Sequence, residues 1–276
     1  MPEREDVNPS ASAAALFAYE LRRLREAKGL SQDGLGDAIG YTGALVRMVE
    51  TLRRTPSRVF AEHADQALKT DGQLSRLWPI VQREAVPGWF RGFAEMESTA
   101  STVRVFECVL IPGLLQTEGY TRALARYRLG HVSDEETDRL VATRTARQEI
   151  LSRPGPPVCT FILDEAVLRR VVGSAAVMKE QLARLLDVGE QGHVFVQVVP
   201  FTAGEYPGLD GNLAMLGLPD GRDVAYVESH AGTAVLIHAP EQVMICSLGF
   251  DAMRSVALSP KESARLIRAA MEELPS

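Results

Sequence analysis

Hydrophobic residues recur every three or four positions in the first third of the chain. Phe17, Leu21 and Leu24 share one face of a helix whose other face carries arginines. Glycine, serine and threonine interrupt the pattern where helices are expected to end and begin. The pattern predicts five short helices, at residues 14–28, 31–39, 42–51, 57–69 and 72–84.

The pattern changes after "AVPGWF" at residues 85–90, where β-branched and aromatic stretches begin to alternate with helical ones. Four strand-like stretches follow one another between His193 and His238, joined by short or glycine-rich turns, which favours an antiparallel sheet. Helical stretches precede and follow them, which indicates the α+β class. We therefore predict a multidomain chain with a flexible arm, an all-α five-helix domain and an α+β domain with a mainly antiparallel sheet, at residues 1–13, 14–85 and 86–276.

Charge is distributed unevenly along the 276 residues. The net charge is -6, yet residues 15–60 hold eight Lys or Arg and five Asp or Glu. A mildly basic module on an acidic body suits local contact with phosphates and argues against nonspecific nucleic-acid binding by the whole molecule.

The remaining composition indicates a cytoplasmic globular protein. No apolar run approaches the roughly 18 residues of a membrane span, and the first residues lack the pattern of a secretory signal. The three cysteines, Cys108, Cys159 and Cys246, form no C-x-x-C and are interpreted as reduced thiols, without disulfides or metal.

The second and third predicted helices have the features of a helix-turn-helix. Gly36 lies where the third helix must cross the second, and Gly40 permits the turn between them. Gln32 begins the second helix, where N–H groups and a partial positive charge meet phosphates. Four apolar residues of these helices are expected in the core: Leu35, Ile39, Val46 and Val49.

The segment "LREAKGLSQDGLGDAIGYTGALVRMVETLRRTPS" resembles the lambda/434 repressor-like (XRE) family of DNA-binding domains, over about residues 16–68. The resemblance implies that Gln32 contacts phosphate and that Arg25 and Glu50 form an ion pair between the first and third helices. It also implies two groups of DNA contacts: Thr42, Gly43, Ala44, Arg47 and Met48 in the major groove, and Arg53 and Arg54 on the flanking backbone. The chain departs from the family at Leu52, where glycine is usual, and at Gly43 and Ala44, where relatives often have base-bonding side chains.

Arg47 is the strong base-recognising side chain in this set, because guanidinium can bond guanine O6 and N7. One such contact supplies about 1–3 kcal/mol of discrimination, so we expect a homodimer on an inverted repeat, with half-sites roughly 34 Å apart. A protein-interaction module that no longer binds DNA is the alternative interpretation of the same helices.

Four stretches of the larger domain resemble the C-terminal domains of actinobacterial, WhiJ-like, antitoxin-like helix-turn-helix regulators. They are "IPGLLQTEGYTRAL", "RQEIL", "ILDEAVLRRVVG" and "ALSPKESARLI". The resemblance implies a domain that dimerises and binds a small BldB-like partner protein or a small-molecule ligand. It leaves open an antitoxin that mainly sequesters its partner and a regulator that senses a small molecule.

Sequence motifs for catalysis are missing: there is no G-x-S-x-G, P-loop or G-x-G-x-x-G. We predict no enzyme, cofactor or metal. Glu228, His230 and His238 could form a metal site, but the simpler interpretation is that all five histidines are hydrogen-bonded or solvent-exposed. Asp164 and Glu165 are interpreted as capping the helix that follows them.

Two further sets in the larger domain are candidates for binding a partner or ligand. Arg144 and Arg147 lie one helical turn apart and could hold an anion, although a solvated or salt-bridged face is the simpler interpretation. Tyr206 and Leu209 lie in a long Gly/Pro-rich loop, "PFTAGEYPGLDGN", of the kind that often forms an interface.

Overall fold

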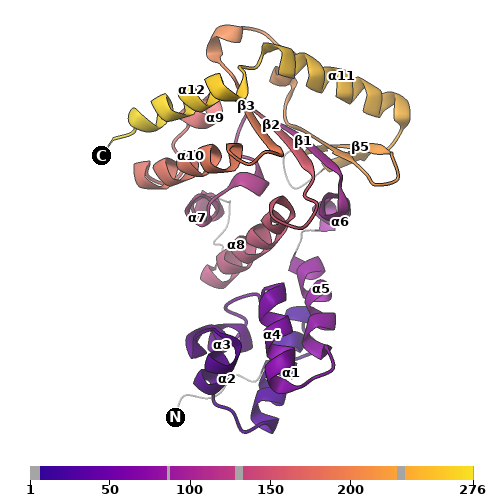
Figure 1. Cartoon of the computed structure of the whole chain (residues 1–276), viewed down its shortest axis with the longest axis vertical. Coiled ribbons are helices and arrows are strands. Elements are labelled where there is room, and N and C mark those ends of the chain that lie inside the picture. The colour runs from indigo at the N-terminus through magenta and orange to yellow at the C-terminus, as the bar shows by residue number, and fades with distance from the viewer. Residues whose placement is uncertain (1–6, 86–87, 128–132, 229–233, 276) are drawn as a thin grey trace. The chain divides into compact units, whose positions relative to one another are not determined.

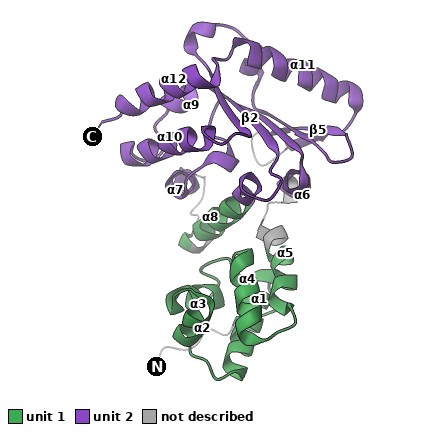
Figure 2. Ribbon diagram, in the orientation of Figure 1, with its two compact units in different colours: residues 1–88, 128–146 green, residues 89–127, 147–276 purple. Residues whose placement is uncertain are grey.

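The computed structural model describes residues 7–85, 88–127, 133–228 and 234–275 (Figure 1). The described chain groups into two compact units, coloured separately in Figure 2. The first comprises Met1–Gly88 and Arg128–Ala146, and the second comprises Trp89–Tyr127 and Arg147–Ser276. This grouping separates the chain after residue 88 and assigns most of one later helix, α8, to the first unit. No described helix has the length and apolar character needed to cross a membrane.

The N-terminal part of the first unit is an all-α domain, as predicted. Its five helices are α1 (Ala13–Ala27), α2 (Gln32–Ile39), α3 (Gly43–Glu50), α4 (Arg58–Leu68) and α5 (Gln73–Ala85). The side-chain oxygens of Ser12, Ser31, Thr42 and Ser57 each accept a hydrogen bond from the first turn of the helix that follows. The helix boundaries therefore follow from the capping residues.

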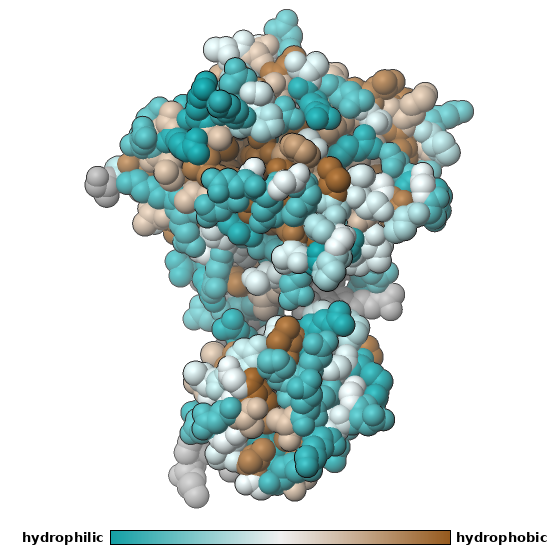
Figure 3. All heavy atoms as spheres, in the orientation of Figure 1, coloured by the Kyte–Doolittle hydropathy of each residue, from teal (hydrophilic) through white to brown (hydrophobic). Residues whose placement is uncertain are grey.

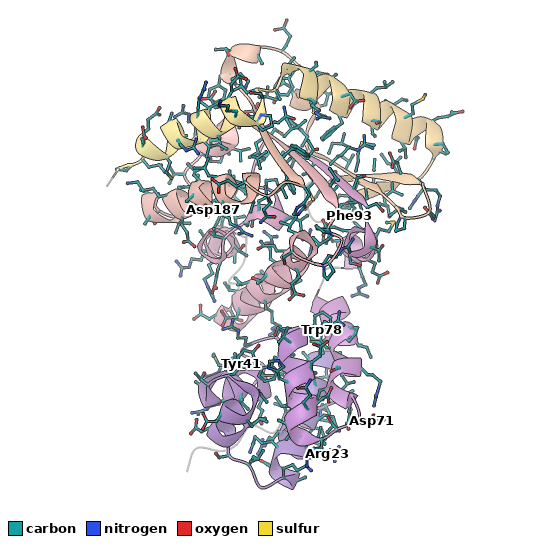
Figure 4. All side chains as sticks on the ribbon, viewed as in Figure 1. Arg23, Tyr41, Asp71, Trp78, Phe93 and Asp187 are labelled. Atoms are coloured by element: carbon teal, nitrogen blue, oxygen red, sulfur yellow. The ribbon has the colours of Figure 1, made fainter. Side chains whose placement is uncertain are left out.

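One hydrophobic core holds these helices together. It is formed by one apolar face of each helix, with Phe17, Leu35, Val46, Phe60 and Leu74 fully buried. Tyr41 packs on this core from the turn between α2 and α3, with its ring centroid 5.5 Å from that of Phe60 (Figure 4). Burial of such a core, rather than helix propensity, stabilises short helices of this kind.

The second unit contains a six-stranded sheet with helices on both faces. The strands are β1 (Thr102–Glu107), β2 (Val158–Asp164), β3 (Val194–Val199), β4 (Leu213–Gly217), β5 (Asp223–Glu228) and β6 (Ala234–Ile237). The helices of this unit are α6 (Gly88–Thr99), α7 (Glu118–Tyr127), α9 (Glu165–Arg169), α10 (Ala175–Gly189), α11 (Pro240–Val256) and α12 (Pro260–Glu272). Between α7 and β2 the chain also forms α8 (Asp134–Gln148), most of which is grouped with the first unit. Short 3₁₀ turns are Gly113–Leu115, Glu149–Leu151, Phe201–Ala203 and Pro207–Asp210.

The α+β class is confirmed, but the sheet is mixed, with strand order β3-β2-β1-β4-β5-β6. β1 pairs with β2, and β2 with β3, in parallel, whereas β4, β5 and β6 form an antiparallel series that joins β1 through β4. The sequence predicted that the strands between His193 and His238 pair in order as antiparallel neighbours. This is correct for β4, β5 and β6 but wrong for β3, which pairs with β2 in parallel. Long helical connections before β2 and β3 permit parallel pairing, and the loop at 200–212 returns the chain from β3 to the far side of β1.

The two faces of the sheet carry separate cores. On one face, α10 and α12 pack against residues such as Phe161 and Val196. On the other face, α11 buries Val243, Phe250 and Met253 against Phe106 and other sheet residues. The sheet with its helices positions the loop at 200–212, which follows β3 (Figure 1).

Candidate DNA-binding surface

Two glycines allow α2 and α3 to approach at backbone distance. A Cβ atom on Gly36 would lie 2.6 Å from the backbone nitrogen of Gly43. A Cβ on Gly43 would lie 2.7 Å from the Cα of Asp33 in α2, which is far closer than real contacts allow. The crossing expected at Gly36 is present, and Gly43 is its partner. The structure thus gives Gly43, which was expected on the groove-facing surface, a buried packing position against α2.

The other predicted groove residues lie on the outer side of α3. Thr42, Ala44 and Arg47 are exposed, and Met48 is half-buried. Thr42 also caps the helix, because its Oγ1 accepts the N–H of Leu45 at 3.3 Å. Within the described residues no ion pair holds the Arg47 side chain, so its guanidinium is available to a ligand.

The ion pair expected between α1 and α3 is present and includes a third residue. Arg25 donates from Nε to Glu50 Oε1 at 2.6 Å and from Nη2 to Glu50 Oε2 at 3.0 Å. Gln32 donates its side-chain amide to Glu50 Oε2 at 2.8 Å. The hydrogen bond to Glu50 is the main cause of a raised Arg25 pKa, against the opposing effect of burial. In this structure Gln32 therefore belongs to the network that fixes the start of α2 on α3.

The end of α3 has an unusual backbone. Leu52 adopts a positive φ of 61°, the conformation that glycine adopts without strain. The N–H groups of Arg53 and Arg54 both bond to the carbonyl of Met48, at 2.8 and 3.1 Å. The chain therefore turns sharply after α3, and Arg53 and Arg54, which follow the turn, are exposed.

A buried aspartate fixes the turn between α4 and α5. Asp65 accepts the N–H groups of Leu74 and Ser75 at 2.9 and 2.8 Å, the Ser75 hydroxyl at 2.6 Å, and the Thr70 hydroxyl. Burial alone would raise the pKa of this carboxyl, but the hydrogen bonds outweigh it and the net pKa is lowered. The ionised carboxylate therefore stabilises this corner more than the protonated carboxyl does.

The carboxylates at the end of β2 have structural partners. Asp164 caps α9 by accepting the N–H of Ala166 at 2.7 Å and also accepts the hydroxyl of Tyr206 at 2.5 Å. Glu165 accepts the N–H of Phe201 at 3.0 Å and pairs with Arg169. The helix-capping interpretation of Asp164 is confirmed, and Glu165 fastens the loop that follows β3.

The loop at 200–212 has an anchored side and an exposed side. Burial, with the bond to Asp164, raises the pKa of Tyr206, which is half-buried and holds the loop to the strand ends. Phe201 and Leu209 are 60% and 65% exposed. Tyr206 thus has a structural position, and Leu209 together with Phe201 of the same loop presents its apolar surface.

Of the two arginines of α8, Arg147 has a buried carboxylate partner. Arg147 makes a two-point ion pair with the buried Glu97, at 2.9 and 3.1 Å, and its guanidinium lies 4.4 Å from the centroid of the Phe90 ring. Arg144 is half-buried and has interactions of its own. The salt-bridged interpretation is therefore correct for Arg147.

The described histidines have ordinary surroundings. His63 Nδ1 lies 3.0 Å from the carbonyl oxygen of Ile39, His193 Nε2 lies 3.0 Å from that of Leu151, and His238 is exposed. His131 and His230 lie outside the described residues, so the metal site considered for His230 does too. No group of three or more His, Cys, Asp or Glu suited to a metal occurs in the described part of the chain. Burial raises the pKa of Cys159 to about 12, which leaves this thiol protonated and unreactive at neutral pH.

Comparison with known protein families matches residues 16–78 to a helix-turn-helix domain. Residues 90–269, more than half of the chain, match a domain of unknown function, DUF5753. Comparison with curated proteins and with solved structures gave no match.

Proposed function

This chain belongs to the DUF5753 domain family, here with a helix-turn-helix domain before that domain, and we propose that it is a transcriptional regulator that recognises operator DNA with α3. The exposed side of α3 carries the proposal. Its inner side is buried on α1 and α2, while Thr42, Ala44 and Arg47 face outward from the first two turns. A helix presented in this way fits the major groove with its N-terminal residues at the base edges.

Each outward residue has a role that its chemistry allows. Arg47 donates two hydrogen bonds to a guanine, whereas Ala44 and Met48 offer apolar contact to a thymine methyl group. Arg53 and Arg54 contact phosphates beside the groove, and Gln32 does so from the start of α2. The resemblance of the segment to the XRE family supports these assignments.

Gly43 is buried and offers no side chain to a base, so Arg47 is left to make the base-specific contact from α3. One such contact supplies about 1–3 kcal/mol of discrimination between the right and the wrong base. We therefore propose binding as a homodimer, with two copies of α3 on an inverted repeat whose half-sites lie roughly 34 Å apart. A single half-site should then bind much more weakly than the palindrome.

The test is fluorescence anisotropy with DNA from upstream of the protein's own gene and with a shuffled duplex of the same composition, across a salt series. The proposal predicts tighter binding to the upstream duplex at every salt concentration. Equal binding to both duplexes, with an affinity that falls steeply as salt concentration rises, would mean phosphate contact without sequence recognition. That result would contradict the proposal.

The DUF5753 domain is proposed to receive the regulatory signal. The exposed Phe201 and Leu209 on a loop fastened by Tyr206 and Glu165 favour a small partner protein, in line with the resemblance to WhiJ-like, antitoxin-like regulators. A hollow between α10 and α12 has a volume of about 70 Å³, well below the roughly 300–1,000 Å³ of most ligand sites. A stoichiometric complex that persists without DNA would favour the antitoxin-like alternative over operator binding as the main function.

A further inference from the structure

The outer surface of α11 is apolar where a solvent-facing helix surface is normally polar. Met244, Ile245 and Leu248 are 59%, 66% and 63% exposed. Their spacing places them on the side of the helix opposite Phe250 and Met253, which are buried on the sheet. Figure 3 shows hydrophobic atoms at the surface over α11. This surface therefore points away from the sheet and into solvent.

The outward residues of α11 have the spacing of a helix that packs on another helix. Positions 241, 245, 248, 252 and 255 alternate steps of four and three, which keeps them in one row along the helix. Large apolar side chains, Ile245 and Leu248, occupy one half of the row, and small side chains, Ala252 and Ser255, occupy the other. Glu241 lies at one end, so the middle of the row carries no charge.

A glycine beside this row has no packing partner in the described part of the chain. Gly249 lies inside the 17-residue helix α11, where glycine is less favourable than alanine. A Cβ atom on Gly249 would meet no heavy atom within 4 Å, whereas a Cβ on Gly36 or Gly43 would collide with the neighbouring helix. The missing side chain of Gly249 therefore lets the backbone of a further helix come close to α11 from outside.

We propose that the outer surface of α11 binds the same surface of a second copy of this chain, with the two α11 helices antiparallel across a two-fold axis. The axis is perpendicular to the helices and passes beside Leu248. The outer sides of the two helices then face each other, and the two sheets lie on the far sides of the helix pair. We name this surface, formed by Met244, Ile245, Leu248, Gly249 and Ala252, the α11 surface.

Self-complementarity favours a second copy in the antiparallel arrangement. Leu248 contacts its equivalent in the other copy at the axis, and Ile245 of each copy lies opposite Ala252 of the other, so a large side chain meets a small one on both sides. The two Glu241 carboxylates lie at opposite ends of the pair, roughly 20 Å apart at 1.5 Å per residue. A parallel pair would instead bring these like charges together and leave the small residues facing each other.

The area of the α11 surface suits a reversible dimer. With exposures of 59–66%, Met244, Ile245 and Leu248 present on the order of 350 Å² per protomer. The smaller residues of the row and the backbone at Gly249 bring a two-fold helix pair to roughly 1,000 Å² in total, at the lower limit of specific interfaces. The dimer is therefore expected to dissociate on dilution. Its biological use rests on the proposed binding to an inverted repeat, which holds two copies together.

The test is the oligomeric state of the full chain without DNA, by sedimentation velocity over a concentration series. The sedimentation coefficient of the wild type should rise with concentration. Leu248→Lys should raise the dimer dissociation constant by about tenfold or more, because it places two like charges side by side at the axis. Val171→Lys is the matched control and should leave the dimer intact. Val171 is 51% exposed, and Val172 beside it packs on the core at the other face of the sheet.

Gly249→Gln separates the interface from the fold of a single copy. Because the position is open and glutamine is a better helix former, thermal unfolding of the monomer at low concentration should occur at an unchanged or higher temperature. The dimer dissociation constant should still rise by about tenfold or more, because the added side chain holds the two helices apart.

A mixture of Leu248→Lys and Leu248→Glu tests the two-fold contact at the axis. Each variant alone should be monomeric at concentrations where the wild type is a dimer. An equimolar mixture should form dimers again, because opposite charges then meet at the axis.

A wild-type chain that stays monomeric at every concentration, or a dimer that neither Leu248→Lys nor Gly249→Gln weakens, would overturn the inference. A mixture of the two Leu248 variants that stays monomeric would overturn the two-fold arrangement. A wild-type monomer that binds a different protein through α11 would overturn the choice of partner. The proposed function fails separately: if dimers form as expected but the wild type does not distinguish upstream from shuffled DNA, the α11 surface stands and the operator proposal does not.

Discussion

Two glycines determine what α3 can offer to DNA. Gly36 and Gly43 let the backbones of α2 and α3 approach closely, and Thr42, Ala44 and Arg47 remain exposed on α3. The XRE family, which this segment resembles, often has a base-bonding side chain at the position of Gly43, but here that position is used for packing. The importance of Arg47 follows from this, because it is the exposed side chain of α3 best suited to a guanine edge.

Gly43→Ala should destabilise the N-terminal domain by about 1–3 kcal/mol, because the added Cβ collides with the backbone of Asp33 and α3 must move away from α2. The loss should exceed the gain in helix propensity that alanine normally brings. Chemical denaturation measures it. An unchanged or higher free energy of unfolding would show that the two helices are not in close contact.

Leu52 is the second residue with a specific consequence, since it holds a left-handed backbone conformation at the end of α3. Leu52→Gly should relieve the backbone strain. Leu52→Ala removes the same side chain beyond Cβ but keeps the backbone strain. The glycine variant should therefore be more stable than the alanine variant by about 1 kcal/mol, measured by thermal or chemical denaturation. Equal stability of the two variants would contradict the assigned backbone conformation.

At the scale of elements, the sequence predicted the helices better than the sheet. The capping residues Ser31, Thr42 and Ser57 act within a few positions, so the ends of α2, α3 and α4 could be located from local signals. The parallel pairing of β1, β2 and β3 depends on contacts between residues more than 30 positions apart, which strand propensity does not encode. The same limit applies to the site: the resemblance to the XRE family implied that Arg47 faces outward, whereas the contact of Gly43 with Asp33 needed the fold.

The corner between α4 and α5 gives a prediction about pH. The Asp65 pKa is lowered in the folded chain, from an unfolded value of about 3.9. Its contribution to stability is complete above the unfolded pKa and is lost as pH falls through the lower folded pKa. Unfolding free energies measured from neutral to acid pH should therefore fall less steeply for Asp65→Asn than for wild type, and the variant should be less stable at neutral pH. Parallel curves for the two proteins would contradict the assigned role.

At the scale of the whole molecule, the chain forms two units with separate hydrophobic cores, and the proposal assigns DNA binding to one and signal reception to the other. The helix-turn-helix segment carries an excess of basic residues on a chain whose net charge is -6. The rest of the chain is net acidic and disfavours nonspecific binding to DNA. Attraction to DNA therefore has to come from the few basic side chains around α3. We propose that the DUF5753 domain receives the regulatory signal, which can act on DNA affinity only by favouring one state of the protein over another.

The most direct test of the central claim compares Arg47→Ala with Arg53→Ala by anisotropy on the upstream and shuffled duplexes. Each variant removes one exposed arginine, so the lost charge is matched. We predict that Arg47→Ala abolishes the preference for the upstream duplex, at a cost of about 1–3 kcal/mol per half-site. Arg53→Ala should weaken binding to both duplexes equally and lower the salt dependence by about one phosphate contact. Retained preference in Arg47→Ala would contradict sequence recognition through this side chain.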